Sequence, residues 1–251
     1  MKDPGSWRPS KFVYRRGKLI ASRDTNEVAV GSRLMVDRVA RCYDATLSQH
    51  ATGLLVDLGC GTVPLYRAYA DLVTDVVCVD LGGTSHARHL DVECDLNGPL
   101  PFPDQTFDTI VLSDVLEHIA RPETLWAEMA RILAPGGEIL MNVPFLYWIH
   151  ASPHDYYRYT ESALRRFVES AELELIRLDA LGGAPEVLAD IVAKNFATIP
   201  LVGRPVATAV QWMAEGISAT RIGGKISRVT SVSFPLGYFL IARKNRVTSS
   251  G

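Results

Sequence analysis

The seven residues from Val56 to Thr62, Val-Asp-Leu-Gly-Cys-Gly-Thr, constrain this chain more than any other stretch. They follow an apolar run that predicts a buried strand, and they precede a segment, Pro64 to Ala70, that predicts a helix. Gly59 and Gly61 allow a sharp turn and a close approach of the backbone to a ligand, and the amides at the helix start point outward as donors. The turn therefore predicts a cradle for a small molecule.

The residues in and after this turn narrow the kind of ligand. A dinucleotide site usually has a third glycine where this chain has Pro64, and the Gly-Lys-Ser/Thr ending of a phosphate loop is absent. Asp57, at the strand end, would face a pyrophosphate unfavourably, whereas it suits an ammonium group. The sequence therefore predicts a ligand that is cationic at one end.

Residues 53 to 180, with the first motif Asp-Leu-Gly-Cys-Gly-Thr and further motifs in order, resemble the class I S-adenosylmethionine-dependent methyltransferases. The resemblance is to the small-molecule branch, with a domain of the type 11 kind. It implies an α/β fold, a Rossmann-like seven-stranded mostly parallel sheet with helices on both faces and an antiparallel last strand. Many members have glycine directly after the threonine, where this chain has Val63.

The same resemblance implies how a cofactor is held. A predicted strand at 76–79 ends in Asp80, where a carboxylate accepts hydrogen bonds from both ribose hydroxyls. Asp95 matches the acidic residue that accepts from the adenine amino group, and Leu-Glu-His after a strand at 108–113 matches the fourth motif. The implied cofactor is S-adenosylmethionine, with S-adenosylhomocysteine as product and no metal. The cofactor-binding residues predicted in this way are Asp57, Gly59, Cys60, Gly61, Asp80, Leu81, Asp95, Leu96, Ser113 and His118.

An aromatic segment follows the strand predicted at 138–143. Loops at the carboxyl edge of a parallel sheet carry function on a rigid scaffold, so this segment is the best candidate for an acceptor pocket. The residues predicted to bind the acceptor are Tyr147, Trp148, Tyr156, Tyr157 and Arg158.

A hydroxyl acceptor benefits from a general base, and His154 beside Asp155 has suitable chemistry because the carboxylate can orient the imidazole. We therefore predict His154 and Asp155 as catalytic residues. The alternative is that these polar groups only tie the loop down by hydrogen bonds. His118 is a weaker base candidate.

The domain organisation follows from the spacing of the predicted elements. Residues 1–50 form an N-terminal arm and an amphipathic helix; the basic arm is expected to be solvated and partly ordered, with a flap over an anionic substrate as the alternative. Residues 51–246 form the methyltransferase domain. Strands at 173–181 and 237–243 are separated by far more residues than a hairpin needs, which predicts a helical insertion or cap at 184–230. Residues 247–251 are expected to be a frayed tail.

Composition excludes some classes of partner. The net charge of −2 argues against a nucleic-acid surface over the whole domain. The absence of an 18-residue apolar run predicts no transmembrane segment, and four cysteines without Cys-x-x-Cys spacing predict reduced thiols and a cytoplasmic location. A lid, a homodimer surface and a peripheral membrane contact all stay open for 184–215.

The predicted function is methyl transfer to a small-molecule acceptor, an oxygen of a sugar or a secondary metabolite, by an enzyme of the EC 2.1.1 type. One alternative is a non-catalytic, cofactor-binding partner or regulatory subunit. A less favoured one is an NAD-dependent oxidoreductase, which the missing third glycine and the Leu-Glu-His run oppose.

Overall fold

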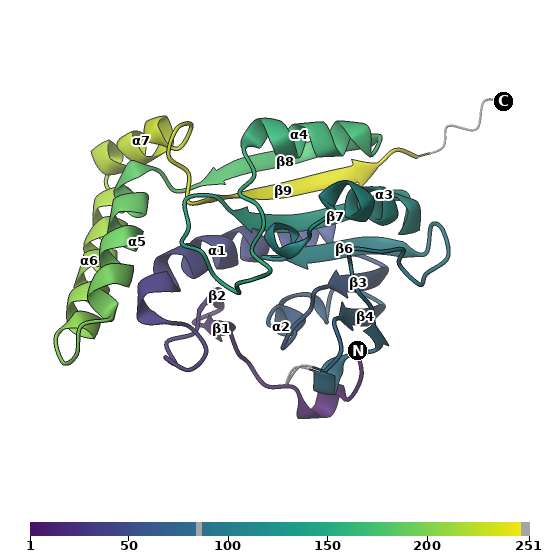
Figure 1. The fold of residues 1–251 in the computed structure, drawn as a ribbon, viewed down its shortest axis with the longest axis horizontal. Coiled ribbons are helices and arrows are strands. Elements are labelled where there is room, and N and C mark those ends of the chain that lie inside the picture. Colours follow the sequence, from purple (N-terminus) through teal and green to yellow (C-terminus); the bar gives the residue numbers. More distant parts are fainter. Residues whose placement is uncertain (84–86, 247–251) are drawn as a thin grey trace.

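A computed structural model describes residues 1–83 and 87–246 (Figure 1). The tail expected at 247–251 lies outside the described residues. The protein is built around one twisted sheet with helices on both faces and a separate group of helices at one end.

The main sheet has seven strands in the order β5-β4-β3-β6-β7-β9-β8. Neighbouring strands from β5 to β7 run parallel, whereas β9 runs antiparallel to both β7 and β8. This confirms the predicted mostly parallel sheet with an antiparallel last strand. The strands are β3 (Leu54–Leu58), β4 (Asp75–Asp80), β5 (Val92–Glu93), β6 (Phe107–Ser113), β7 (Leu133–Pro144), β8 (Leu173–Leu181) and β9 (Gly237–Lys244).

Helices cover the two faces of this sheet. Alternate residues of each strand point to opposite faces, so Leu55 packs in the core beneath α1 and α2, whereas Val56 packs in the core beneath α3 and α4. The helices are α1 (Arg33–His50), α2 (Tyr66–Tyr69), α3 (Pro122–Ile132) and α4 (Glu161–Ser170). Short 3-10 helices lie at Pro4–Ser6, Val30–Ser32, Ala87–His89 and Leu116–His118.

Strand β7 begins earlier than the sequence indicates. The sequence predicts a strand at 138–143 preceded by the turn signal Pro135-Gly136-Gly137, but these three residues lie inside β7. Leu133 already pairs with Phe107 of β6, and a register shift between Phe107 and Thr109 accommodates the irregular stretch. The expected break is therefore a bulge in the sheet.

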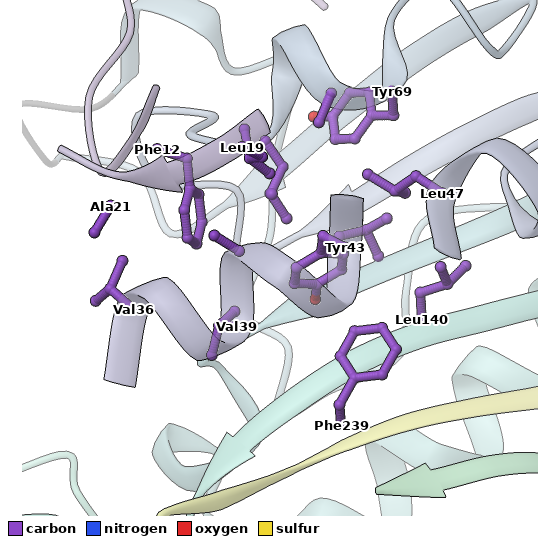
Figure 2. Packing of buried hydrophobic residues seen from close by; sticks show 14 of the residues in the cluster. Phe12, Leu19, Ala21, Val36, Val39, Tyr43, Leu47, Tyr69, Leu140 and Phe239 are labelled. Atoms are coloured by element: carbon purple, nitrogen blue, oxygen red, sulfur yellow. The ribbon is translucent and has the colours of Figure 1, made fainter. Parts of the chain in front are cut away.

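The N-terminal segment is a packed hairpin, which corrects the expectation of a solvated arm. Strands β1 (Phe12–Arg15) and β2 (Lys18–Ala21) pair antiparallel across a turn at Arg16 and Gly17, both of which have positive φ. Phe12 and Leu19 are buried in the core beside α1 (Figure 2). The basic residues mark the exposed side of the hairpin, while its apolar residues fix it to the domain.

Three helices between β8 and β9 form the predicted insertion: α5 (Ala184–Ala197), α6 (Gly203–Ala219) and α7 (Arg221–Thr230). They gather at the end of the domain beyond α1 (Figure 1). Arg38 of α1 donates to buried Glu186 at 2.8 Å, and Gln211 donates to the carbonyl oxygen of Val30 at 2.7 Å. In residues 1–83 and 87–246, no helix has both the length and the apolar character needed to cross a membrane.

A buried amide joins α1 to the carboxyl end of the sheet. Asn142 of β7 is fully buried, and its Oδ1 accepts hydrogen bonds from Tyr43 Oη at 3.1 Å and Ser113 Oγ at 2.8 Å. Its Nδ2 donates to Asp114 Oδ1 at 2.6 Å. Since buried polar groups need such partners, this network fixes how α1 lies against β6 and β7.

We expect Tyr43→Phe to lower the free energy of unfolding by about 0.5 to 1.5 kcal/mol, because it removes one buried hydrogen bond and keeps the ring against Phe239. Urea unfolding measures this difference. Tyr14→Phe is the matched control, since Tyr14 is exposed, and it should change stability by less than about 0.5 kcal/mol. Equal effects of the two substitutions would contradict the role given to the network.

Candidate active site

The glycine turn lies between β3 and α2 at the carboxyl edge of the sheet. Gly59 has a φ of +71°, and a Cβ there would come within 2.5 Å of Val115 Cγ2, so only glycine fits. The amides of Gly59 and Cys60 donate to the carbonyl oxygen of Val79. A Cβ at Gly61 would meet no atom within 4 Å, which leaves open space over the turn for a ligand.

Asp57 ends β3 beneath this turn. Its side chain is buried and accepts a hydrogen bond from Tyr69 Oη at 2.7 Å. Burial raises the pKa of the Asp57 carboxyl to about 7, although the Tyr69 hydrogen bond lowers it. A cationic group placed nearby would favour the charged form of this carboxylate.

Asp80 lies at the end of β4, directly beside the turn. One carboxylate oxygen accepts from the amide of Gly61 at 2.7 Å, and the other accepts from the amide of Leu81 at 2.7 Å. Leu81 follows with more than half of its surface exposed, at 54%. The predicted ribose and adenine residues are thus adjacent to the glycine turn.

The predicted adenine-binding pair follows β5. Asp95 is exposed and accepts hydrogen bonds from the amide and the side chain of Asn97, which together lower its pKa. Leu96 is buried in the core beneath α3. Asp95 therefore presents a charged carboxylate at the same edge of the sheet.

The end of β6 brings Ser113 and Asp114 to this edge. Asp114 has a φ of +54° and joins two parts of the chain: its carboxylate accepts from Asn142 and pairs with Lys11 at 2.5 Å. The N-terminal segment also contacts the glycine turn, because Ser10 Oγ lies 2.9 Å from Thr62 Oγ1 and Trp7 Nε1 donates to the carbonyl oxygen of Val63 at 3.0 Å. Residues 7–11 therefore lie along the carboxyl ends of β3 and β6.

Comparison with known proteins matches this arrangement. Residues 56–141, which hold the glycine turn, Asp80, Asp95 and Ser113, match the family model of the methyltransferase domain. An S-adenosylmethionine-dependent methyltransferase from Mesorhizobium loti has the same fold, with a TM-score of 0.54, 16% identity, and coverage of 84% of this chain and 100% of that one. Residues 56–141 thus form part of a methyltransferase domain, on the fold of the class I S-adenosylmethionine-dependent methyltransferases.

Curated relatives of the methyltransferase domain carry different names. A ubiquinone biosynthesis O-methyltransferase of Idiomarina loihiensis is 28% identical over 169 residues, which are 54% of this chain and 69% of the relative. A probable tRNA methyltransferase 9B of Mus musculus is 34% identical over 100 residues, which are 38% of this chain. The chain spans only about a fifth of that mouse protein, 22% of its length.

A cavity of about 230 Å³ adjoins the end of β6 in the methyltransferase domain. It lies between the N-terminal segment, the start of α1 and the segment that follows β7. Its polar lining residues are Lys11, Glu27, Ser32, Asp114, Glu117, Tyr147 and His150. A larger cavity of about 730 Å³ lies between the hairpin and α2, but none of the predicted site residues lines it.

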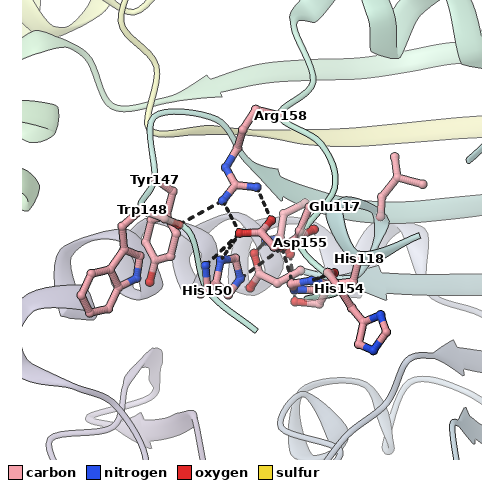
Figure 3. Close-up of polar contacts among 12 residues, drawn as sticks. Glu117, His118, Tyr147, Trp148, His150, His154, Asp155 and Arg158 are labelled. Atoms are coloured by element: carbon pink, nitrogen blue, oxygen red, sulfur yellow. Dashed lines mark hydrogen bonds and ion pairs between the residues drawn. The ribbon is translucent and has the colours of Figure 1, made fainter. Parts of the chain in front are cut away.

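Glu117 is the most buried charged residue of this cavity. Its side chain is inaccessible to solvent, and burial raises its pKa well above the ordinary value, with Asp114 adding to the effect. His118 Nε2 and His150 Nε2 lie 3.7 Å and 3.8 Å from Glu117 Oε1 (Figure 3). Burial and the neighbouring His118 lower the pKa of His150, so His150 is neutral at pH 7.

The predicted pairing of His154 with Asp155 is wrong in this structure. Asp155 accepts two hydrogen bonds from Arg158 and one from the amide of His150, and these bonds lower its pKa. His154 is exposed, and its Nδ1 lies 3.0 Å from Tyr156 Oη instead. The physical reason is that Arg158, three residues after Asp155, carries a full charge and binds both carboxylate oxygens, so it displaces His154 as the partner.

Only one of the five predicted acceptor residues, Tyr147, lines the cavity. Trp148 is half exposed, and Arg158 is occupied by Asp155. Tyr156 and Tyr157 are exposed, and their backbone amides donate to the carbonyl oxygen of Glu117. Their contribution is to hold the loop against the 3-10 helix at Leu116–His118.

The helical insertion directly contacts the loop at residues 145–159, which follows β7. Lys194 of α5 pairs with buried Asp190, and its Nζ lies 3.4 Å from the centre of the Tyr147 ring and 5.7 Å from that of Trp148. Cation–π contacts of this kind are stronger where water is excluded. The insertion therefore braces the residue that closes one side of the cavity.

Sequence reasoning missed six polar residues of the cavity, namely Lys11, Glu27, Ser32, Asp114, Glu117 and His150. Glu117 and His150 had a local signal. Glu117 directly precedes the predicted His118, and His150 lies in the same loop as the predicted His154. Lys11 belongs to the basic arm for which a flap over an anionic substrate was the alternative, whereas Glu27 and Ser32 had no signal, since only packing brings them to this edge.

We predict that cofactor affinity depends on the ionisation of Asp57. The pKa of Asp57 is near 7 in the free protein, so below neutral pH an ammonium-bearing ligand has to displace the proton of this carboxyl group. Affinity for S-adenosylhomocysteine should therefore rise between about pH 5.5 and 7.5. Calorimetry in buffers of different ionisation enthalpy measures both affinity and proton release. Asp57→Asn should bind more weakly and show a flat profile; an unchanged profile in that variant would refute the assignment.

Proposed function

We propose that this chain transfers a methyl group from S-adenosylmethionine to a small-molecule acceptor, at an oxygen atom of a sugar or a secondary metabolite. The observation that carries the proposal is the position of the cavity of about 230 Å³. Asp114, which directly follows β6, lines this cavity, so the cavity lies beside the predicted cofactor motifs. The Idiomarina O-methyltransferase, which matches over 54% of this chain, supports the oxygen acceptor.

The residues of the turn and of the strand ends fit the cofactor. The open space above Gly61 admits a ligand to the backbone, and Asp80 offers two carboxylate oxygens beside it. Asp57 supplies a negative charge in a buried place, which suits an ammonium group. When bound, the sulfonium of the cofactor supplies a methyl group that is already activated toward displacement.

The size of the cavity favours a small acceptor. Pockets for drug-sized ligands measure roughly 300 to 1,000 Å³, and this one, at about 230 Å³, lies just below that range. Its walls come from separate parts of the chain: Lys11, Ser32 and Tyr147, with Ser32 Oγ 2.9 Å from Tyr147 Oη. A polymer such as a nucleic acid would need an open groove of positive charge instead.

The group of Glu117, His118 and His150 faces this cavity and is the part of the site best placed to engage an acceptor hydroxyl. Transfer to oxygen requires that the hydroxyl proton leave, and alignment of the acceptor with the methyl group supplies the rest of the rate. The cavity lining includes Glu117 and His150 but not His154. We therefore assign the acceptor-engaging role to His150 in place of His154.

Asp80→Ala should weaken binding of S-adenosylhomocysteine by at least about 100-fold, because it removes two charge-assisted hydrogen bonds, each worth about 1.5 to 3 kcal/mol. Calorimetry measures the loss. Asp75→Ala is the matched control, since Asp75 begins the same strand at the opposite edge of the sheet, and it should bind normally. If the wild-type protein binds neither S-adenosylmethionine nor its product but takes up NAD, the proposed function fails.

His150→Ala should lower turnover by roughly 10²- to 10⁴-fold, whereas His154→Ala should lower it by less than about tenfold. An acceptor found by screening with a methyl-labelled donor allows the comparison. Both variants should keep the affinity for S-adenosylhomocysteine. The opposite order of effects would restore His154, and a wild-type protein that binds the cofactor but methylates no acceptor would favour the non-catalytic partner.

A further inference from the structure

Three potential metal ligands converge beside the cavity. Glu117, His118 and His150 each offer one donor atom, and these atoms all lie within 4.8 Å of one another (Figure 3). Glu117 and His118 come from the 3-10 helix after β6, whereas His150 comes from the loop after β7. The rings of the two histidines lie edge to face, with centres 4.8 Å apart.

The Glu117 carboxylate is buried and lacks a partner. Both of its oxygens are inaccessible, and neither makes a hydrogen bond to any residue that the structure describes. A buried carboxylate in this condition is costly unless a proton or a cation satisfies it. The two nearest nitrogens, at 3.7 Å and 3.8 Å, are beyond hydrogen-bond distance, so neither imidazole satisfies the carboxyl group by a hydrogen bond.

A hydrogen bond on the far side of the His118 imidazole defines which of its nitrogens is free, whereas His150 Nδ1 makes no hydrogen bond. His118 Nδ1 lies 2.8 Å from the carbonyl oxygen of His154, and since a carbonyl only accepts, Nδ1 carries the proton. His150 Nδ1 lies 3.4 Å from Asp155 Oδ2, whose position Arg158 fixes. His118 Nε2 is therefore left with a lone pair that faces Glu117, and His150 Nε2 lies at a similar distance from the same carboxylate.

These outer contacts are the kind that metal-binding histidines make. A histidine ligand usually donates its second ring N–H to a backbone carbonyl or a carboxylate, and this contact fixes its tautomer and orientation. Here one histidine has the carbonyl and the other has the carboxylate. The nearby cations Lys11 and Arg158 are paired with Asp114 and Asp155, so their charges are already compensated.

We propose that Glu117 Oε1, His118 Nε2 and His150 Nε2 bind one divalent metal ion of the zinc class. Two imidazoles and one carboxylate suit zinc and its transition-metal neighbours better than magnesium. A tetrahedral ion needs donors about 3.4 Å apart, which the two half-buried histidines reach by small rotations. This proposal departs from the metal-free site that the sequence resemblance implies.

Three protein ligands leave one position of a tetrahedral ion open. Glu117 and His150 both line the cavity, so that position faces the space assigned to the acceptor. Resting on the proposed function, the ion would hold the acceptor oxygen and lower the pKa of its hydroxyl. The site itself does not depend on the methyl-transfer reaction.

The test uses the full chain purified without a polyhistidine tag and freed of metal by a chelator. Calorimetry with Zn²⁺ and visible absorption with Co²⁺ should show one bound ion per chain. His118→Gln, His150→Gln and Glu117→Gln should each lower Zn²⁺ affinity by at least about 100-fold. The matched control is His50→Gln, because His50 lies 2.6 Å from Glu138 at the opposite edge of the sheet and should bind Zn²⁺ normally.

Binding of S-adenosylhomocysteine and thermal unfolding are measured on the same samples. They show whether each variant is folded. Glu117 is fully buried and Glu117→Gln is the variant most at risk of misfolding, so His150→Gln, at a side chain that is 30% exposed, provides an independent test. Wild-type protein that binds the cofactor but no Zn²⁺ would overturn the metal site and leave the proposed function standing. Equal losses in His50→Gln and His150→Gln would also overturn it, whereas Zn²⁺ binding without cofactor binding would overturn only the methyl-transfer proposal.

Discussion

The buried amide of Asn142 is the interaction on which the rest of the structure depends. It sits where water cannot reach, so its oxygen and nitrogen need protein partners, and they take them from Tyr43 of α1, Ser113 of β6 and Asp114. These bonds fix the helix against the sheet. Asp114 in turn holds Lys11, so the same network carries the N-terminal segment to the carboxyl edge.

Two neighbouring sites share this edge because parallel strands end there together. The glycine turn, Asp57 and Asp80 lie at the ends of β3 and β4, while Asp114, Glu117 and His150 lie after β6 and β7. The cofactor motifs and the cavity therefore meet at the end of β6. In this arrangement a donor and an acceptor bound to the same edge would approach each other without any large movement of the sheet.

The scaffold and the acceptor side have different physical origins. Residues 56–141 match the family model, whereas the acceptor loop at 145–159 and the insertion lie beyond it. The matched relatives bear names with different acceptors, a quinone pathway and tRNA, which agrees with a common scaffold that hosts many functions. The proposed acceptor specificity therefore rests on Tyr147, on Lys194, which contacts its ring, and on the loop that Arg158 holds to Asp155.

The sequence by itself determined the class of fold. The glycine turn, the acidic strand ends and the alternation of strands and helices predicted a mostly parallel sheet, because these signals are local. Only the tertiary structure decided that Asp155 pairs with Arg158, that the hairpin is packed, and that Glu117 meets His118 and His150. The contact of Glu117 with His150 joins two different loops, and the pairing of Asp155 with Arg158 follows from competition for the carboxylate, neither of which is encoded in local spacing.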